Sequence, residues 1–177
     1  MGKTITVSKL DAAKRQTQTA LELWFADRDP VAVHTLAFAS HEIIHRLYKL
    51  AGHKTLLFDV VTGPKEAKID YARMVKHSGN FFKHAKIERE HATPLEFDPI
   101  WNEIFLGVSL TALKTMGETM SVEAHAFMVW LFTRHPNWFS EAAKSLVPTN
   151  MSNEVREIPK AELLEVAHRH FKRLEAS

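Results

Sequence analysis

Residues 29–52 read DPVAVHTLAFASHEIIHRLYKLAG, and this pattern indicates one long amphipathic helix. Asp29 and Pro30 supply a side-chain cap and a proline at the first helical position, and Gly52 is a residue type that commonly follows a helix end. A helical projection gathers apolar side chains on one broad arc that we expect to face the core: Val33, Leu36, Ala37, Ile43, Ile44 and Leu47. The run therefore predicts a helix packed against other helices.

Helix-start and helix-stop signals recur along the rest of the chain. Ser8 with Asp11 resembles a capping box, and the pair Asp98-Pro99 repeats the device seen at residue 29. The expected helices span residues 8–25, 30–52, 64–85 with a possible break at Gly79, 99–117, 121–135, 138–146 and 160–174. Strand-like alternation and hairpin dipeptides are missing from the sequence. We therefore expect an all-α fold, a single-domain helical bundle of five to seven helices over residues 1–177.

The composition narrows the classes of function. The chain has 177 residues, and 23 basic against 21 acidic residues give a net charge of only +2, without the basic surplus of a non-specific nucleic-acid binder. Cysteine is absent, which excludes disulfides, thiolate metal sites and cysteine nucleophiles. The sequence also lacks a signal-peptide core and an apolar run of about 18 residues, so we expect a cytoplasmic protein with no membrane partner.

Residues 41–45 match H-E-x-x-H, a spacing that sets two imidazoles one helical turn apart with a carboxylate beside them. This pattern predicts a metal site formed by His41, Glu42 and His45, for a divalent ion such as Zn, Fe or Mn. A zinc protease is disfavoured, because Tyr48 and Ala51 occupy positions where the metzincin extension needs glycine and histidine. A metal-dependent enzyme or a metal-binding protein is therefore one hypothesis.

Three histidines of the long helix share a stripe at the margin of its apolar arc. His34, His41 and His45 fall between the expected buried face and the charged face. Such a position suits the wall of a cleft. It suits equally well half-buried histidines that hydrogen-bond a neighbouring helix, and both interpretations remain open.

Residues 78–85 read SGNFFKHA and form the second informative segment. On a helix, Asn80, Lys83 and His84 share one face, where an amide, an ammonium and an imidazole can bind an anion. In the alternative interpretation, the paired phenylalanines pack into the core, Asn80 caps a break at Gly79, and Lys83 is merely solvated.

Packing of this segment against the long helix would bring the three histidines opposite Asn80, Lys83 and His84. In that arrangement His34 and His84 are the candidates for acid or base catalysis, and Asn80 and Lys83 for anion binding. The expected partner is RNA or a small anionic ligand.

The start of the first helix at residues 8–13, the Asp29-Pro30 cap with residues 34–37, and the run NFFKHA at 80–85 resemble a group of bacterial all-helical proteins of similar size. More remotely, the Asn-x-x-Lys-His helix is similar to HEPN-type helical bundles. That resemblance implies a homodimer and a role in RNA cleavage or nucleotide transfer.

The working motif of HEPN-type bundles is an arginine followed by a histidine after four to six intervening residues. The pairs Arg28 with His34 and Arg46 with His53 have this spacing, but they straddle an expected helix start and an expected helix end. The chain thus departs from the pattern that ribonuclease activity requires, and the comparison concerns the fold.

A third hypothesis is a structural or interaction protein without a catalytic role. Trp130, Trp138 and Phe139 would supply an aromatic dimer surface if they are exposed.

Overall fold

The computed structural model describes residues 4–53, 77–83, 94–138, 155 and 157–175. The elements are α1 (Lys9–Phe25), α2 (Pro30–Leu50), α5 (Ile100–Thr115), α6 (Val122–Arg134), the short 3₁₀ helix η2 (Pro136–Trp138) and α9 (Lys160–Glu175). Residues 77–83 are also helical and are called helix 77–83 below. Every regular element within the described residues is a helix and none is a strand, which confirms the all-α class.

The ends of the helices follow the signals in the sequence. Ser8 and Asp11 form a reciprocal capping box, and one carboxylate oxygen of Asp29 accepts hydrogen bonds from the first turn of α2. Asp98, just before α5, accepts from the backbone N–H of Ile100 at 3.0 Å. Gly52 adopts a φ of 88°, in the left-handed region that favours glycine after a helix end. Local chemistry thus sets where the helices begin and end.

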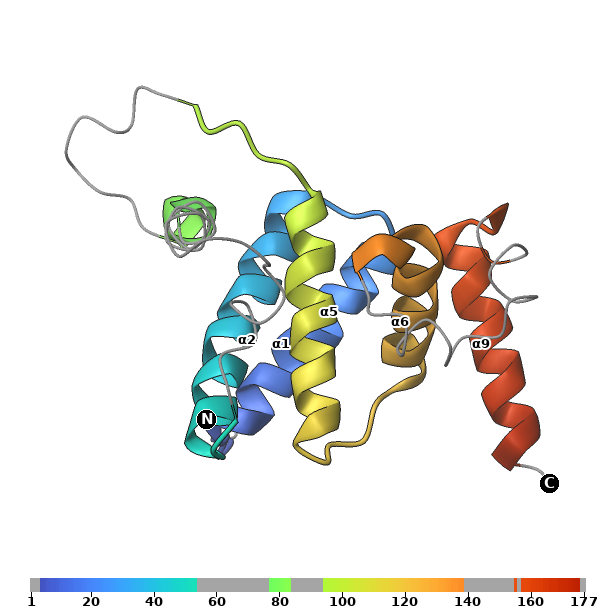
Figure 1. Ribbon diagram of the computed structural model, residues 1–177, viewed down its shortest axis with the longest axis horizontal. Helices are drawn as coiled ribbons and strands as arrows, with labels where there is room; N and C mark the ends of the chain where they lie inside the picture. The colour runs from blue at the N-terminus through green and yellow to red at the C-terminus, as the bar shows by residue number, and fades with distance from the viewer. Residues whose placement is uncertain (1–3, 54–76, 84–93, 139–154, 156, 176–177) are drawn as a thin grey trace.

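Helices α2, α5, α6 and α9 follow one another across the molecule, and α1 runs obliquely behind α5 (Figure 1). Contacts join α1 to α2, α2 to α5, and α6 to α9. The large core side chains Trp24, Phe105 and Phe127, from α1, α5 and α6, belong to one buried cluster to which α2 and α9 also contribute. A second, smaller cluster around Ile44 closes the other end of α1, α2 and α5.

Helix 77–83 packs against α2 through Gly79. A Cβ placed on Gly79 would lie 2.3 Å from two ring carbons of Phe38, which is itself only 2% exposed. Gly79 is therefore not a break, and that expectation was wrong: the residue lies inside the helix, where its missing side chain lets two helices approach closely.

Other expectations fall on residues that the structure does not cover. The helical pieces expected at 64–75, 84–85 and 139–146 lie outside the described residues. Within the described part of the chain, no helix has both the length and the apolar character needed to cross a membrane.

The close approach at Gly79 makes a testable prediction. Gly79→Ala should destabilise the protein by roughly 1–3 kcal/mol despite the higher helix propensity of alanine, because the ring of Phe38 is buried and has no room to yield. Urea unfolding measures the change, with the exposed Asn80→Ala on the same helix as control. Equal stability of the two variants would show that the contact is not tight.

Candidate functional site

Helix α5 covers the histidine stripe of α2, which places the histidines deeper than expected. His34 is fully buried and His41 is 2% exposed, whereas His45 is half-buried. The helical spacing of Asn102, Phe105 and Ser109 presents one face of α5 to this stripe. The stripe is therefore part of the packed interior, because α5 supplies both polar and aromatic partners for the imidazoles.

His34 is hydrogen-bonded at both ring nitrogens. The side-chain amide of Asn102 donates from Nδ2 to the carbonyl oxygen of Pro30 at 2.9 Å, which leaves Oδ1 as the acceptor that faces His34. Nδ1 of His34 lies 2.8 Å from that oxygen and must carry the proton. Nε2 then accepts from the hydroxyl of Ser78, whose Oγ lies 3.1 Å away. The chain of bonds fixes a single tautomer of His34.

This network joins three segments of the protein and keeps the imidazole neutral. Burial lowers the pKa of His34 below its ordinary value, and the hydrogen bond with Asn102 opposes that shift. Because His34 is fully buried and bonded on both sides, it does not face a ligand directly as the sequence suggested. Its hydrogen bond with Ser78 links the imidazole to the outer part of the site.

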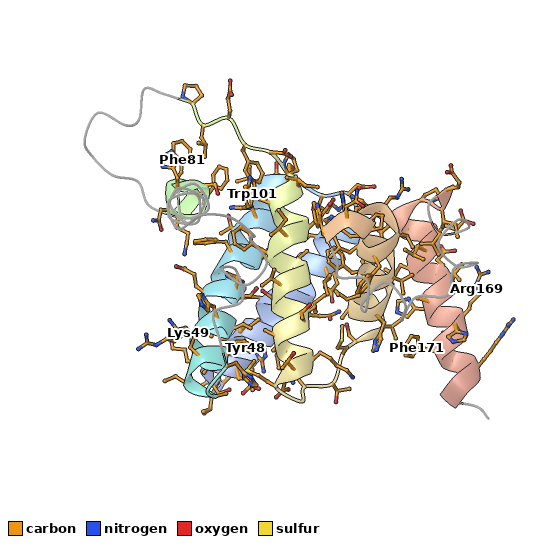
Figure 2. The ribbon with its side chains drawn as sticks, in the orientation of Figure 1. Tyr48, Lys49, Phe81, Trp101, Arg169 and Phe171 are labelled. Atoms are coloured by element: carbon orange, nitrogen blue, oxygen red, sulfur yellow. The ribbon has the colours of Figure 1, made fainter. Side chains whose placement is uncertain are left out.

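A cleft of about 580 Å³ lies next to Ser78. It is bordered by helix 77–83, by the segment that leads into α5, and by the first turn of α5, with the lining residues His77, Ser78, Leu95, Glu96, Phe97, Asp98, Pro99 and Trp101. The rings of Phe97 and His34 have centroids 4.7 Å apart, so the buried network lies close behind this wall. Figure 2 shows Phe81 on helix 77–83 and Trp101 at the start of α5, at the same end of the molecule.

The outer side of helix 77–83 carries the anion-binding candidates. Asn80 and Phe81 are exposed, and Phe81 retains 41% of its surface. The ammonium of Lys83 lies 2.5 Å from a carboxylate oxygen of Glu42 and 4.5 Å from the ring centroid of Phe38. Helix 77–83 and α2 therefore do pack side by side, but Ser78 rather than Asn80 faces His34. His84 lies outside the described residues.

The H-E-x-x-H segment is divided between the interior and the surface. Glu42 points outward to Lys83, whereas His41 and His45 turn inward with ring centroids 5.7 Å apart. Nδ1 of His41 lies 3.4 Å from Oγ of Ser109, and its buried Nε2 has no hydrogen-bond partner in the described part of the chain. Within the same residues, no three histidine, aspartate or glutamate side chains gather as a metal site.

The remaining sequence candidates are scattered. Arg28 and Arg46, the arginines of the HEPN-like spacings, are exposed, whereas His34 is fully buried. Trp130 is buried in the core, while Trp138 is 39% exposed and stacks on His135 with centroids 3.9 Å apart. Phe139, the third aromatic residue of the expected dimer surface, lies outside the described residues.

Sequence reasoning missed Ser78, Asn102 and the cleft. Asn102 and Ser109 did leave a signal, because both are polar residues on the apolar face of a helix that also buries Phe105. A polar side chain at a core position needs a buried partner, and a histidine on another helix was the available candidate. The partnership itself depends on tertiary packing. Comparison of the chain with protein-family models, with curated proteins and with solved structures gave no match.

The buried histidines predict a particular loss of stability in acid. Burial, aided by the charge of nearby His45, lowers the pKa of His41 to about 3 from its ordinary value of 6.5. The unfolded chain therefore binds a proton that the folded protein refuses as the pH falls from 6.5 toward 3, and stability declines by about 1.4 kcal/mol per pH unit for such a residue. His34, whose pKa is also lowered, acts in the same direction.

We expect His41→Leu to make the decline in stability with falling pH shallower, since leucine binds no proton in either the folded or the unfolded state. Urea unfolding at a series of pH values between 4 and 8 measures the slope. Ile44→Val, a substitution in the same buried region without a titrating group, should weaken the protein and leave the slope as it was. Parallel curves for His41→Leu and the unmodified protein would contradict the burial of a neutral His41.

Proposed function

We propose that the protein is a HEPN-like helical module that binds unpaired RNA, with a base held in the cleft beside helix 77–83. The observation that carries the proposal is that the aromatic residues Phe97 and Trp101 border the same cavity as the polar residues His77 and Ser78. A cavity of about 580 Å³ is of the size that takes a small organic group.

The lining of the cleft suits an unpaired base. Single-stranded RNA is recognised when a splayed base stacks on an aromatic side chain, and Phe97 and Trp101 offer such rings. The carboxylates of Glu96 and Asp98 supply acceptors for the amino groups of a base, as acidic side chains do toward cytosine. Two carboxylates disfavour a phosphate at the same place, so the sugar-phosphate chain must leave the cleft.

Helix 77–83 gives that chain a path. Lys83 lies six residues after His77, which is about 9 Å along a helix at its ordinary rise per residue. Asn80 and Phe81 are exposed between them and offer an amide and a second ring. A phosphate that reaches Lys83 has to compete with Glu42, whose side chain is about half exposed in the ion pair. Such an exposed pair is weak enough to open.

Because a phosphate and Glu42 would compete for Lys83, substitutions of Lys83 and of Glu42 should have opposite effects on RNA binding. Lys83→Ala should weaken binding of a labelled single-stranded RNA several-fold and reduce its salt dependence by about 0.7 in log K against log salt. Glu42→Gln should strengthen binding, because it releases Lys83 for the phosphate. Fluorescence anisotropy at several salt concentrations measures both effects, and the distant ion pair of Lys14 with Glu118 supplies the matched controls Lys14→Ala and Glu118→Gln.

Single-stranded RNA, duplex RNA of the same sequence and a free nucleotide are compared in the same assay. Preference for the single strand, with loss on Trp101→Ala, supports a base in the cleft. Binding of the free nucleotide alone would favour a small anionic ligand as the partner. The proposal would be overturned if none of these ligands bound, or if Lys83→Ala and Glu42→Gln bound the RNA with equal affinity.

A metal-binding protein is the second candidate, and the observation that favours it is Nε2 of His41, which lies beside His45 and has no hydrogen-bond partner among the described residues. Neutral imidazoles are good ligands for Zn, Fe or Mn, but Glu42 is turned away to Lys83 and does not complete the set. The proposal of a divalent metal thus rests on His41 and His45, with Glu42 excluded from the inner ligands.

Elemental analysis of protein purified without a histidine tag or chelator tests this candidate. Stoichiometric metal that disappears in His41→Leu and persists in Glu42→Gln would support two histidine ligands. Loss of metal in Glu42→Gln would require a different rotamer of that side chain, and protein that refuses added metal would reject the candidate.

The resemblance to HEPN-type bundles also implies a homodimer, which we include in the proposal together with a cytoplasmic location. The exposed Trp138 is the described aromatic residue that remains from the predicted dimer surface. Light scattering of the purified protein measures the oligomeric state.

A further inference from the structure

We propose that Ser78 is a nucleophile activated by His34, and that the cleft hydrolyses carboxylic esters with an aromatic part. The bonds run in one line from a hydroxyl to an imidazole and from the imidazole to an orienting amide. This is the order of nucleophile, base and orienting group that recurs in hydrolases on unrelated folds, with an amide in the third place as in papain-like enzymes.

The tautomer of His34 in this chain of hydrogen bonds is the one that a general base needs. Pro30 fixes the amide of Asn102, and Asn102 places the proton of His34 on Nδ1. Nε2 is therefore the basic nitrogen, and it lies 3.1 Å from Oγ of Ser78, within reach for proton transfer. A general base toward Ser78 requires this tautomer, because only an unprotonated Nε2 can accept the hydroxyl proton.

The position of Ser78 also fits. Ser78 borders the cleft at 8% exposure, while His34 and Asn102 lie behind it at 0% and 2%. The base is thus shielded from water while the nucleophile faces the cavity. Phe97 and Trp101 offer contact to an aromatic group, and the carboxylates of Glu96 and Asp98 disfavour an anionic substrate. A neutral aromatic ester satisfies these conditions.

The reaction balances with water as the only co-reactant. Oγ of Ser78 attacks the carbonyl carbon as its proton passes to Nε2 of His34, and the tetrahedral intermediate expels the alcohol, which takes that proton. Water then attacks the acyl-serine, gives a proton to His34, and the acid departs as Ser78 recovers its hydrogen. His77 lines the same cleft and offers an N–H that can donate to the oxyanion.

Labelling with a fluorophosphonate probe tests the nucleophile without knowledge of the natural ester. The intact protein should form one covalent adduct, which peptide mass spectrometry places on Ser78, and should release p-nitrophenol from p-nitrophenyl acetate. Ser78→Ala should abolish both signals while Ser121→Ala, at the start of α6, leaves them unchanged. Absence of an adduct on Ser78, under conditions that label a known serine hydrolase, would overturn the proposal.

A cysteine in place of Ser78 tests the role of His34 directly. The chain contains no cysteine, so Ser78→Cys introduces a single thiol whose alkylation rate can be followed against pH. Burial and the carboxylates of Glu96 and Asp98 both raise the pKa of a thiol, whereas transfer of the thiol proton to Nε2 of His34 gives a thiolate-imidazolium pair that lowers it, as would a positive charge on His77. We expect an apparent pKa at least one unit below the ordinary value of about 8.5.

Three further variants distinguish the effect of His34 from that of His77 and from that of exposure alone. Asn80→Cys, on the exposed side of the same helix, should titrate near the ordinary value. Ser78→Cys combined with Asn102→Ala should move back toward it, because the positioning of His34 is lost, whereas Ser78→Cys with His77→Gln should not. A thiol at residue 78 with an ordinary or raised pKa would show that its contact with His34 is only structural.

Hydrolysis and RNA binding share the cleft but fail separately. Lys83→Ala weakens RNA binding and leaves the adduct on Ser78 intact, because Lys83 pairs with Glu42 and does not border the cleft. Labelling without RNA binding would retain the ester hydrolase and reject the RNA module. RNA binding without labelling would do the reverse.

Discussion

A single buried imidazole holds the candidate site together. His34 is fully buried and bonded at both nitrogens, to Asn102 of α5 on one side and to Ser78 of helix 77–83 on the other. A buried polar ring is tolerated because both bonds are made, and breaking either one would leave a donor or an acceptor without a partner. The position of helix 77–83, and with it one wall of the cleft, therefore depends on this residue.

The interior of the site holds the hydrogen bonds of His34, and its surface holds the ion pair of Lys83. Inside, Asn102 and Pro30 fix the direction of the bonds and keep Nε2 of His34 toward Ser78. Outside, Lys83 is held by Glu42 and is available only to a ligand that displaces that carboxylate. The glutamate of the H-E-x-x-H segment thus pairs with an ammonium on another helix, while His41 and His45 turn toward the interior.

The sequence predicted the local features well. Asp29 caps α2 and Gly52 follows its end, because caps depend on neighbouring residues. The sequence also suggested that helix 77–83 packs against α2, but it took Gly79, the residue at that contact, for a break. It did not predict that α5 would cover the histidine stripe, since the choice of packing partner depends on the whole fold. The direction of Glu42 was equally hidden, because the side chain turns toward a cation contributed by a distant segment.

The tautomer of His34 tests the hydrogen-bond network of the site most directly. Nitrogen-15 NMR of histidine-labelled protein at neutral pH, with His34 assigned through loss of its signals in a His34→Gln variant, reports which ring nitrogen carries the proton. The hydrogen-bond chain predicts one slowly exchanging proton on Nδ1 and an unprotonated Nε2. A proton on Nε2, or an average of the two tautomers, would contradict the network on which the site is built.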